Sequence, residues 1–418
     1  MDVDQVISRI SAMGVQAEVI YVRTRMTEFS WEKGSQHGMS YTETGYGLRV
    51  VKGSRQGFAY GPRLDEGLID RALKAADAMG PDPYNSLPAP EGPIEQLPGA
   101  FDPSLEEPHE LLRGYLDVLL AEASDQVNVI MARSWGGWAE VTVRNTEGVD
   151  ASQRSSYCGV VISGNIVEGD YVGPEISEYV DARSPKGLMP EVAVRRLVEK
   201  ANMTRNRRRA QLSGRPIVLT PKAVNSLLFP LLNHAVSLEN IFRGRSPIKP
   251  GDQLGSNITI YDDPRLPDAP WSRAFDGEGL PTKRITIVRD GLFHTPLSNT
   301  YWARRAGSVN THSSWRTFMT LPAISATYLV FEAPSVKDIG DAVIVDDVQG
   351  VHTSNFDTGE FSVTASVAWD SDGGLREFVI SGDLRSLLAG VLGALPAPER
   401  YGRVVTGSLL VSGLRVSS

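Results

Sequence analysis

The stretch LTPKAVNSLLFPLLNHAVSLENIFRGRSPIKP, residues 219–250, decides how the second half of the chain folds. Thr220 followed by Pro221 is a helix start, because a hydroxyl cap precedes a proline in the first turn. Apolar side chains then recur at steps of three and four residues, so one face of the helix is apolar. Pro230 lies inside this pattern and is expected to kink or split the helix. The stretch therefore predicts a kinked helix over residues 221–243.

The C-terminal half of this helix has part of the spacing of a zinc-peptidase helix. Such a helix carries two histidines about one turn apart and a glutamate beside the first, so two ring nitrogens reach one Zn²⁺ and the carboxylate reaches its water. Here the segment NHAVSLE, residues 233–239, holds a single histidine, His234. His234 and Glu239 are five residues apart and point in different directions around a helix. The simpler interpretation of both is a polar helix face or a cleft lining.

The composition of the chain limits the classes of protein to which it can belong. A chain of 418 residues predicts two or three domains with a large core, and its formal net charge of -8 argues against nucleic-acid binding. The single cysteine, Cys158, excludes an internal disulfide and fits a reducing compartment. The first residues have neither the basic nor the apolar region of a secretory signal, and no apolar run approaches the ~20 residues of a membrane span. We therefore expect a cytoplasmic protein with no membrane partner.

The order of predicted elements is mixed. Helices are expected at residues 2–13, 64–79, 111–123 and 190–203, among strands that include the separate runs 17–24, 26–31, 127–134 and 138–145. No regular βαβ alternation is present, so the fold class is α+β rather than a doubly wound sheet. We predict an N-terminal α/β domain, residues 1–212, followed by a mainly antiparallel β C-terminal domain, residues 213–418, that carries the kinked helix.

Four further stretches occur in a fixed order along the chain. They are GYGLRVVKGSRQGFAYG at 45–61, VLTPKAVNSLLFPLLNHAVSLENIFRGRS at 218–246, YDDPRLPDAPWSRAFDGEGLPTKRITIVRDGLFHTPLSNTYWARRAG at 261–307 and VQGVHTSNFDTGEFSVTASVAW at 348–369. In this order they resemble the TldD/PmbA family, on its PmbA (TldE) side, over nearly the whole chain. The stretch 308–331 is less similar to ordinary PmbA members.

The resemblance carries expectations about chemistry. TldD members resemble zinc peptidases with an HExxxH helix and a cysteine ligand, whereas PmbA members lack those ligands and pair with a TldD subunit in a heterodimeric peptidase for unfolded or precursor peptides. On this chain the motif's His, Glu and second His fall at Asn233, His234 and Leu238. Leu238 cannot bind zinc, Asn233 is a poor ligand, and the C-terminal half holds no cysteine. We therefore expect no catalytic residue and no metal here, and zinc in a TldD-like partner.

Polar residues around this helix are the candidate contacts with a peptide or a partner. Arg243 and Arg245 follow the helix, where cations suit its dipole and where a peptide carboxylate or a partner's acidic residue would find a guanidinium. His352 and Asn355 belong to a polar turn that either lines a cleft or only shapes the turn. The full set of predicted cleft or partner contacts is Asn233, His234, Glu239, Arg243, Arg245, His352 and Asn355.

Two other groups are weaker candidates. His294, His312 and His352 all fall in the C-terminal half, but they share no local spacing that is typical of a metal site. Cys158 lies in an alternating strand, SSYCGVVIS, where a small buried side chain is the common role and a nucleophile would need a nearby histidine.

The sequence thus predicts a non-catalytic PmbA/TldE-like subunit that pairs with a TldD-like zinc peptidase and helps enclose a peptide channel. Two alternatives stay open. One is a metal-independent hydrolase or biosynthetic enzyme that uses C-terminal His and Asp residues, and activity of the chain alone in the presence of a chelator would favour it. The other is a homodimeric module that binds peptides without cleaving them, and binding without turnover would favour that.

Overall fold

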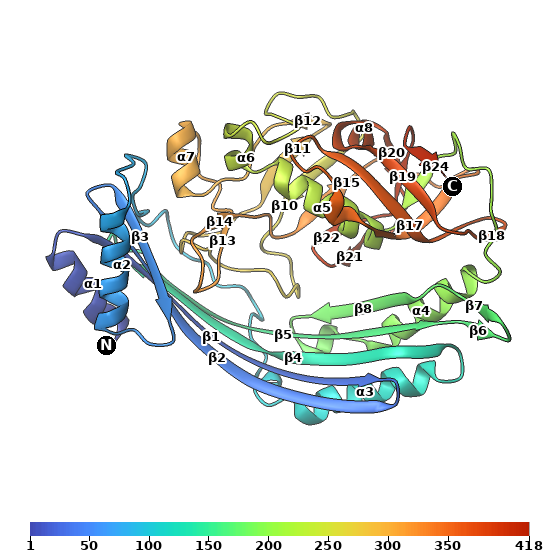
Figure 1. The fold of residues 1–418 in the computed structure, drawn as a ribbon, viewed down its shortest axis with the longest axis horizontal. Coiled ribbons are helices and arrows are strands. Elements are labelled where there is room, and N and C mark those ends of the chain that lie inside the picture. Colours follow the sequence, from blue (N-terminus) through green and yellow to red (C-terminus); the bar gives the residue numbers. More distant parts are fainter. Residues whose placement is uncertain (418) are drawn as a thin grey trace.

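The computed structural model describes residues 1–417, which form a long curved sheet with helices and, against it, a second β-rich body (Figure 1). All neighbours in the first sheet are antiparallel, in the order β3-β2-β1-β4-β5-β8. The elements of this N-terminal region are α1 (Val3–Ala12), β1 (Gln16–Glu32), β2 (Ser35–Lys52), β3 (Arg55–Gly61), α2 (Glu66–Ala78), α3 (His109–Ala123), β4 (Asn128–Asn145), β5 (Asp150–Asn165), the short β6 (Val167–Glu168) and β7 (Tyr171–Val172), β8 (Ile176–Ala182) and α4 (Pro190–Met203).

The C-terminal region contains two larger sheets, in the orders β12-β11-β10-β15-β22-β21 and β20-β23-β9-β16-β17-β19-β24. Only the pairs β15–β22 and β9–β16 are parallel among the described strands, so the predicted α+β class with a mainly antiparallel second half is confirmed. The helices are α5 (Pro221–Ala235), α6 (Leu238–Phe242), α7 (Thr300–Ala306) and α8 (Leu384–Ala389). The strands are β9 (Ile217–Leu219), β10 (Thr259–Asp262), β11 (Ile285–Arg289), β12 (Leu292–Phe293), β13 (Ser314–Trp315), β14 (Ala323–Ile324), β15 (Leu329–Glu332), β16 (Val343–Gln349), β17 (Glu360–Asp370), β18 (Gly373–Gly374), β19 (Phe378–Asp383), β20 (Val391–Ala394), β21 (Glu399–Tyr401), β22 (Val404–Thr406), β23 (Leu409–Val411) and β24 (Arg415–Ser417).

The long strands of the first sheet run through places where the sequence predicted breaks. β1 is one strand rather than the two predicted at 17–24 and 26–31, and β4 joins the runs predicted at 127–134 and 138–145. The glycines inside β4 favour a predicted break in the strand, because a pair of glycines usually ends a strand. Gly137 instead permits a close approach, since a Cβ there would lie 2.0 Å from the backbone oxygen of Arg25 in β1.

The helix that organises the C-terminal region begins as predicted but breaks elsewhere. The side chain of Thr220 caps α5 by accepting a hydrogen bond from the amide of Ala223. Pro230 lies inside α5 without ending it, so of the predicted kink or split at this residue the split is wrong. The break comes at Val236 and Ser237, because Val236 and Leu238 pair their backbone groups with Leu297 at 2.8 Å instead of continuing the helix.

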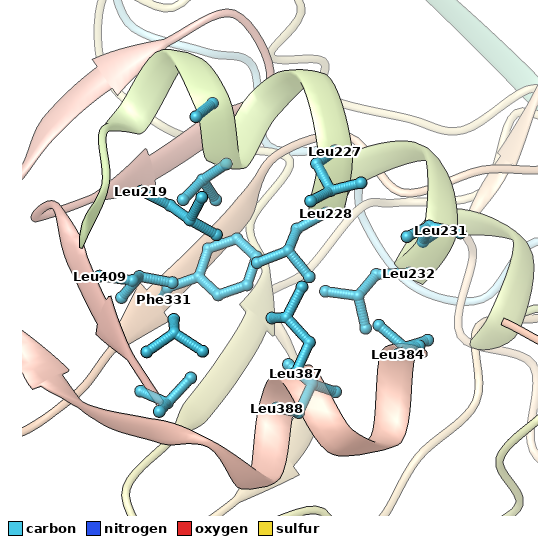
Figure 2. Close-up of a cluster of buried hydrophobic side chains, with 14 of the residues drawn as sticks. Leu219, Leu227, Leu228, Leu231, Leu232, Phe331, Leu384, Leu387, Leu388 and Leu409 are labelled. Carbon is cyan, nitrogen blue, oxygen red and sulfur yellow. The ribbon is translucent and has the colours of Figure 1, made fainter. Parts of the chain in front are cut away.

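The core of the C-terminal region is built on α5 (Figure 2). Four leucines of α5 are buried and pack among apolar side chains of α8, β9, β15 and β23: Leu227, Leu228, Leu231 and Leu232 face Leu219, Phe331, Leu384, Leu387, Leu388 and Leu409. The helix is therefore held by packing on its apolar face, whatever its polar end does. In residues 1–417 no helix combines the length and the apolar character that crossing a membrane would need.

A buried group of charges joins the two regions. Arg49 of β2 donates from Nε and Nη2 to Glu18 of β1 at 3.1 and 2.9 Å, and from Nη2 to Glu278 of the C-terminal region at 3.3 Å. Nη2 of Arg316, also from the C-terminal region, lies 2.6 Å from Oε1 of Glu18, the oxygen that also accepts from Nε of Arg49. All four side chains are buried, so the ion pairs fix how the two regions face each other.

A second buried group of charges lies at the start of α5. The Lys222 ammonium is 2.7 Å from the backbone oxygen of Ser177 and 3.2 Å from Glu178 of β8. Lys200 of α4 bridges Glu178 and Asp346 of β16, at 2.8 Å from each. The N-terminal and C-terminal regions are thus linked at two places by paired charges that are largely buried.

Replacing a core leucine of α5 tests the packing. We expect Leu228→Ala to lower the free energy of unfolding by about 2–5 kcal/mol, because it leaves a cavity in the core. Leu392→Ala in β20 is the matched control, since Leu392 is 44% exposed and its truncation should cost less than about 1 kcal/mol. Equal losses for the two variants, measured by urea denaturation, would contradict this account of the core.

Replacing each of the two arginines at the junction should lower the free energy of unfolding by a different amount. Arg49→Met leaves Glu18 and Glu278 short of hydrogen bonds in a buried site, so we expect it to cost about 3–5 kcal/mol in unfolding free energy. Arg316→Met should cost clearly less, because Nε and Nη1 of Arg316 are buried without a partner and their removal relieves a desolvation cost. Urea denaturation of both variants checks the order, and a larger loss for Arg316→Met would refute it.

Candidate functional site

The three residues at the zinc-motif positions do not converge on one point. The side-chain oxygen of Asn233 accepts a hydrogen bond from the amide of Ala326 at 2.7 Å. Leu238 is buried, and its backbone pairs with Leu297. The break after α5 therefore places Leu238 on a new helix, α6, rather than one turn further along α5.

His234 has both ring nitrogens engaged. Its Nε2 lies 2.9 Å from the backbone oxygen of Arg245 and 3.0 Å from the carboxylate of Asp357. Its Nδ1 faces the side-chain amide of Asn240 at 3.2 Å, and that amide also donates to the backbone oxygen of His234. Nε2 therefore carries the proton and Nδ1 accepts, so no lone pair of the ring is free for a metal.

The predicted arginines are held by carboxylates of the same chain. Arg245 lies 3.1 Å from Asp357, and Arg243 lies 3.0 Å from Glu239, one helical turn away. Asp357 is the residue that the sequence analysis missed, since its partners are more than 100 positions away along the chain. The structure thus brings His234 and Arg245 together around Asp357, and it pairs Arg243 separately with Glu239.

The remaining predicted contacts shape a turn. Asn355 accepts hydrogen bonds from the amides of Asp357 and Thr358, so its side chain closes the loop that presents Asp357. His352 is exposed in a short 3-10 helix just before it.

The residues of this chain do not fit the zinc that the family resemblance implies. His294 is exposed, whereas His312 is buried with its ring nitrogens 2.8 Å from the backbone oxygen of Pro281 and 2.9 Å from Glu91. Burial raises the pKa of the Cys158 thiol to about 12, which disfavours the thiolate that a ligand or nucleophile needs. No group of three His, Cys, Asp or Glu side chains within residues 1–417 is arranged to hold a metal ion.

A cavity of about 460 Å³ lies between the curved sheet and the C-terminal region. Its floor is formed by side chains from one face of the sheet, which alternate along the strands: Met26 of β1, Trp135, Ala139, Val141 and Val143 of β4, and Gln153, Ser155 and Tyr157 of β5. Its roof is formed by two loops of the C-terminal region that contribute Trp271, Arg273, Phe275 and Trp315. The alternation in β4 was visible in the sequence, but the opposite wall comes from more than 100 residues away.

Side-chain hydrogen bonds to Ala326 and Thr327 connect this roof to α5. The side-chain oxygen of Asn233 accepts a hydrogen bond from the amide of Ala326. The next residue, Thr327, accepts a hydrogen bond at its hydroxyl from Nη2 of Arg273 at 2.9 Å. Arg403 donates from Nε to the backbone oxygen of Thr327 at 3.0 Å, and its guanidinium lies 5.7 Å from the ring centre of Trp271. The polar end of α5 therefore supports the wall of the cavity.

Burial perturbs the charged groups behind the roof. Asp262 accepts from the amides of Thr327 and Tyr328, yet burial raises the pKa of its carboxyl to about 6. Burial, followed by repulsion from Arg273, lowers the pKa of Arg403 to about 10. Burial also lowers the pKa of Arg273. Two guanidinium groups thus repel each other next to the cavity.

Family models match three successive parts of the chain. The PmbA/TldA metallopeptidase domain 1 matches residues 17–79, the central domain matches residues 99–204, and the C-terminal domain matches residues 213–418. The chain belongs to the TldD/PmbA family. The resemblance predicted from the sequence is therefore confirmed, and the chain is a member of a peptidase family.

Relatives match over nearly the full length. An uncharacterized protein of Methanocaldococcus jannaschii is 28% identical over 99% of this chain and 99% of its own. A protein of Haemophilus influenzae named metalloprotease PmbA homolog is 25% identical over 97% of this chain and 92% of its own. The crystal structure of TldE from Thermococcus kodakarensis superimposes with a TM-score of 0.86 at 23% identity and covers 99% of each chain, which confirms the fold.

The raised pKa of Asp262 predicts a pH-dependent stability. Because the folded state binds this proton more tightly than the unfolded chain, whose ordinary value is 3.8, the stability that it contributes is full below about pH 4 and is lost as the pH rises through about 6. Asp262→Asn keeps an oxygen for both amides and does not titrate. We expect the variant to gain up to about 3 kcal/mol relative to the natural protein between pH 4 and 7. A difference that stays constant across this range, measured by urea denaturation, would argue against the shift.

Proposed function

We propose that this chain is the non-catalytic, TldE-like subunit of a heterodimeric zinc peptidase, and that it contributes a wall of the peptide-binding space while a TldD-like partner supplies the zinc. The observation that carries the proposal is the bond between Asn233 and the amide of Ala326. The residue at the first ligand position of the family motif is thereby used to position a loop. The second ligand position, Leu238, is apolar and lies on a different helix.

The family relationship supports the peptidase context. Members named as metalloproteases match almost the whole chain, so the architecture of the enzyme is preserved here. A subunit that retains the architecture without metal ligands can still bind substrate, because the cavity between the two regions needs only packing and hydrogen bonds.

The two alternatives from the sequence remain distinct hypotheses. A metal-independent enzyme would need an activated nucleophile or base, but the thiol of Cys158 is buried with a raised pKa and His234 is engaged at both nitrogens. A homodimeric peptide-binding module would need no partner, and it is an outcome of the experiment below.

Reconstitution with a TldD-like chain that carries the HExxxH motif tests the proposal. We expect this chain alone to leave an unfolded polypeptide uncleaved, and the mixture to elute as a one-to-one complex that cleaves it and stops on addition of a zinc chelator. His234→Ala in this chain should leave cleavage in place, whereas Glu→Gln in the partner's motif should abolish it.

Three results would count against the proposal. Cleavage by this chain alone in the presence of chelator would favour an enzyme in its own right. Elution of this chain as a homodimer that forms no complex with the partner would favour the binding module. Loss of cleavage in His234→Ala with the complex intact would assign chemistry to this chain.

A further inference from the structure

We propose that the cavity between the curved sheet and the C-terminal region binds the C-terminal end of a peptide, with an apolar last side chain among the aromatic residues and the terminal carboxylate on Arg273. The inference rests on the proposed function for its ligand class, a peptide, but it concerns this chain alone. It assigns a binding site to the subunit that lacks the zinc.

The walls of the cavity suit a large apolar side chain. Trp135, Tyr157 and the flexible side chain of Met26 line the floor, and Trp271 and Trp315 line the roof. Trp271 is 50% exposed and Trp315 is 42% exposed, which is unusual for tryptophan in a folded chain and leaves apolar area to be covered. A volume of about 460 Å³ lies within the range of about 300–1,000 Å³ that is typical of small-ligand pockets.

The charged residues that line the cavity differ in whether they have a partner within this chain. Asp181 is paired with Arg400, Asp276 accepts from the amides of Glu278 and Leu280, and Arg316 is paired with Glu18. Of the two arginines that line the cavity, only Arg273 has no carboxylate oxygen within 4.0 Å of its guanidinium, as far as residues 1–417 are concerned, and Asp276 and Asp262 attract its charge from a greater distance.

The remaining hydrogen-bond capacity of Arg273 points to an anionic ligand. Its Nη2 donates to the hydroxyl of Thr327 at 2.9 Å, whereas its Nε is buried without a partner. The neighbouring Arg403 has the same charge and donates only to the backbone oxygens of Ala326 and Thr327 and to Ser325. A carboxylate on Arg273 would complete its hydrogen bonds and offset the repulsion between the two guanidinium groups.

These features together select the end of a peptide. A carboxylate and an apolar side chain on the same residue match one guanidinium beside an aromatic-lined space, and in a peptide it is the C-terminal residue that carries both. An internal acidic residue would bring the charge without the apolar group.

Calorimetric titration of the full chain with a flexible hexapeptide that ends in phenylalanine tests the inference. We expect the free-acid peptide to bind at least about tenfold more tightly than the same peptide with a C-terminal amide, because a charge-assisted hydrogen bond is lost. Arg273→Gln should bring this ratio close to one, and Arg273→Lys should keep part of it. Trp271→Ala should weaken both peptides, whereas Arg209→Gln, an exposed arginine outside the cavity, should change neither.

Each contrary result is distinct from failure of the proposed function, since no partner is present in the titration. Equal affinity for acid and amide in the natural chain would remove the role of Arg273. Equal affinity for N-acetylphenylalanine and the hexapeptide acid would make the ligand a small aromatic acid rather than a peptide. An unchanged ratio in Arg273→Gln with the fold intact by circular dichroism would overturn the assignment.

Discussion

The structure depends on pairing charges where two regions of the chain meet without water. Arg49 reaches Glu18 within its own sheet and Glu278 across the junction, and Lys222 and Lys200 do the same with Glu178 and Asp346. An unpaired charge in such a place costs several kcal/mol, so the two regions have few ways to sit together. The cavity exists because this fixed junction holds the face of the long sheet opposite the loops around Trp271 and Trp315.

Within that frame, α5 is held in place by its apolar face. The apolar face of the helix fills the core between two sheets, and that packing does not depend on what stands at its polar end. Asn233 then supports the loop at Ala326 and Thr327. Thr327 in turn accepts hydrogen bonds from Arg273 and Arg403. Asn233, which the family resemblance aligns with a zinc-ligand position, thus supports one wall of the cavity.

Local patterns predicted much of the fold. The cap at Thr220, the helices over residues 64–79, 111–123 and 190–203, and the α+β class follow from spacing and capping that neighbouring residues determine. The continuity of β4 through Gly137 did not follow, because it depends on the backbone of β1. The break at Ser237 was missed for the same reason, since its cause is pairing with Leu297.

The candidate site was predictable only in part. His234 and Arg245 were selected from the helix and do meet, but Asp357, which joins them, comes from a distant loop. The cavity was not predicted at all, because its floor and roof are separate in the sequence and neither has a motif of its own. The sequence predicted that Asn233 and Leu238 would not hold a metal, and the structure shows which contacts these two residues make.

The metal content of the purified chain, expressed alone and never exposed to chelator, tests the central claim most directly. Elemental analysis by mass spectrometry should find zinc far below one ion per chain, because the residues at the motif positions are engaged with backbone groups or are apolar. Near-stoichiometric zinc would contradict the account, and it would return His234, His294, His312 and His352 to consideration as ligands.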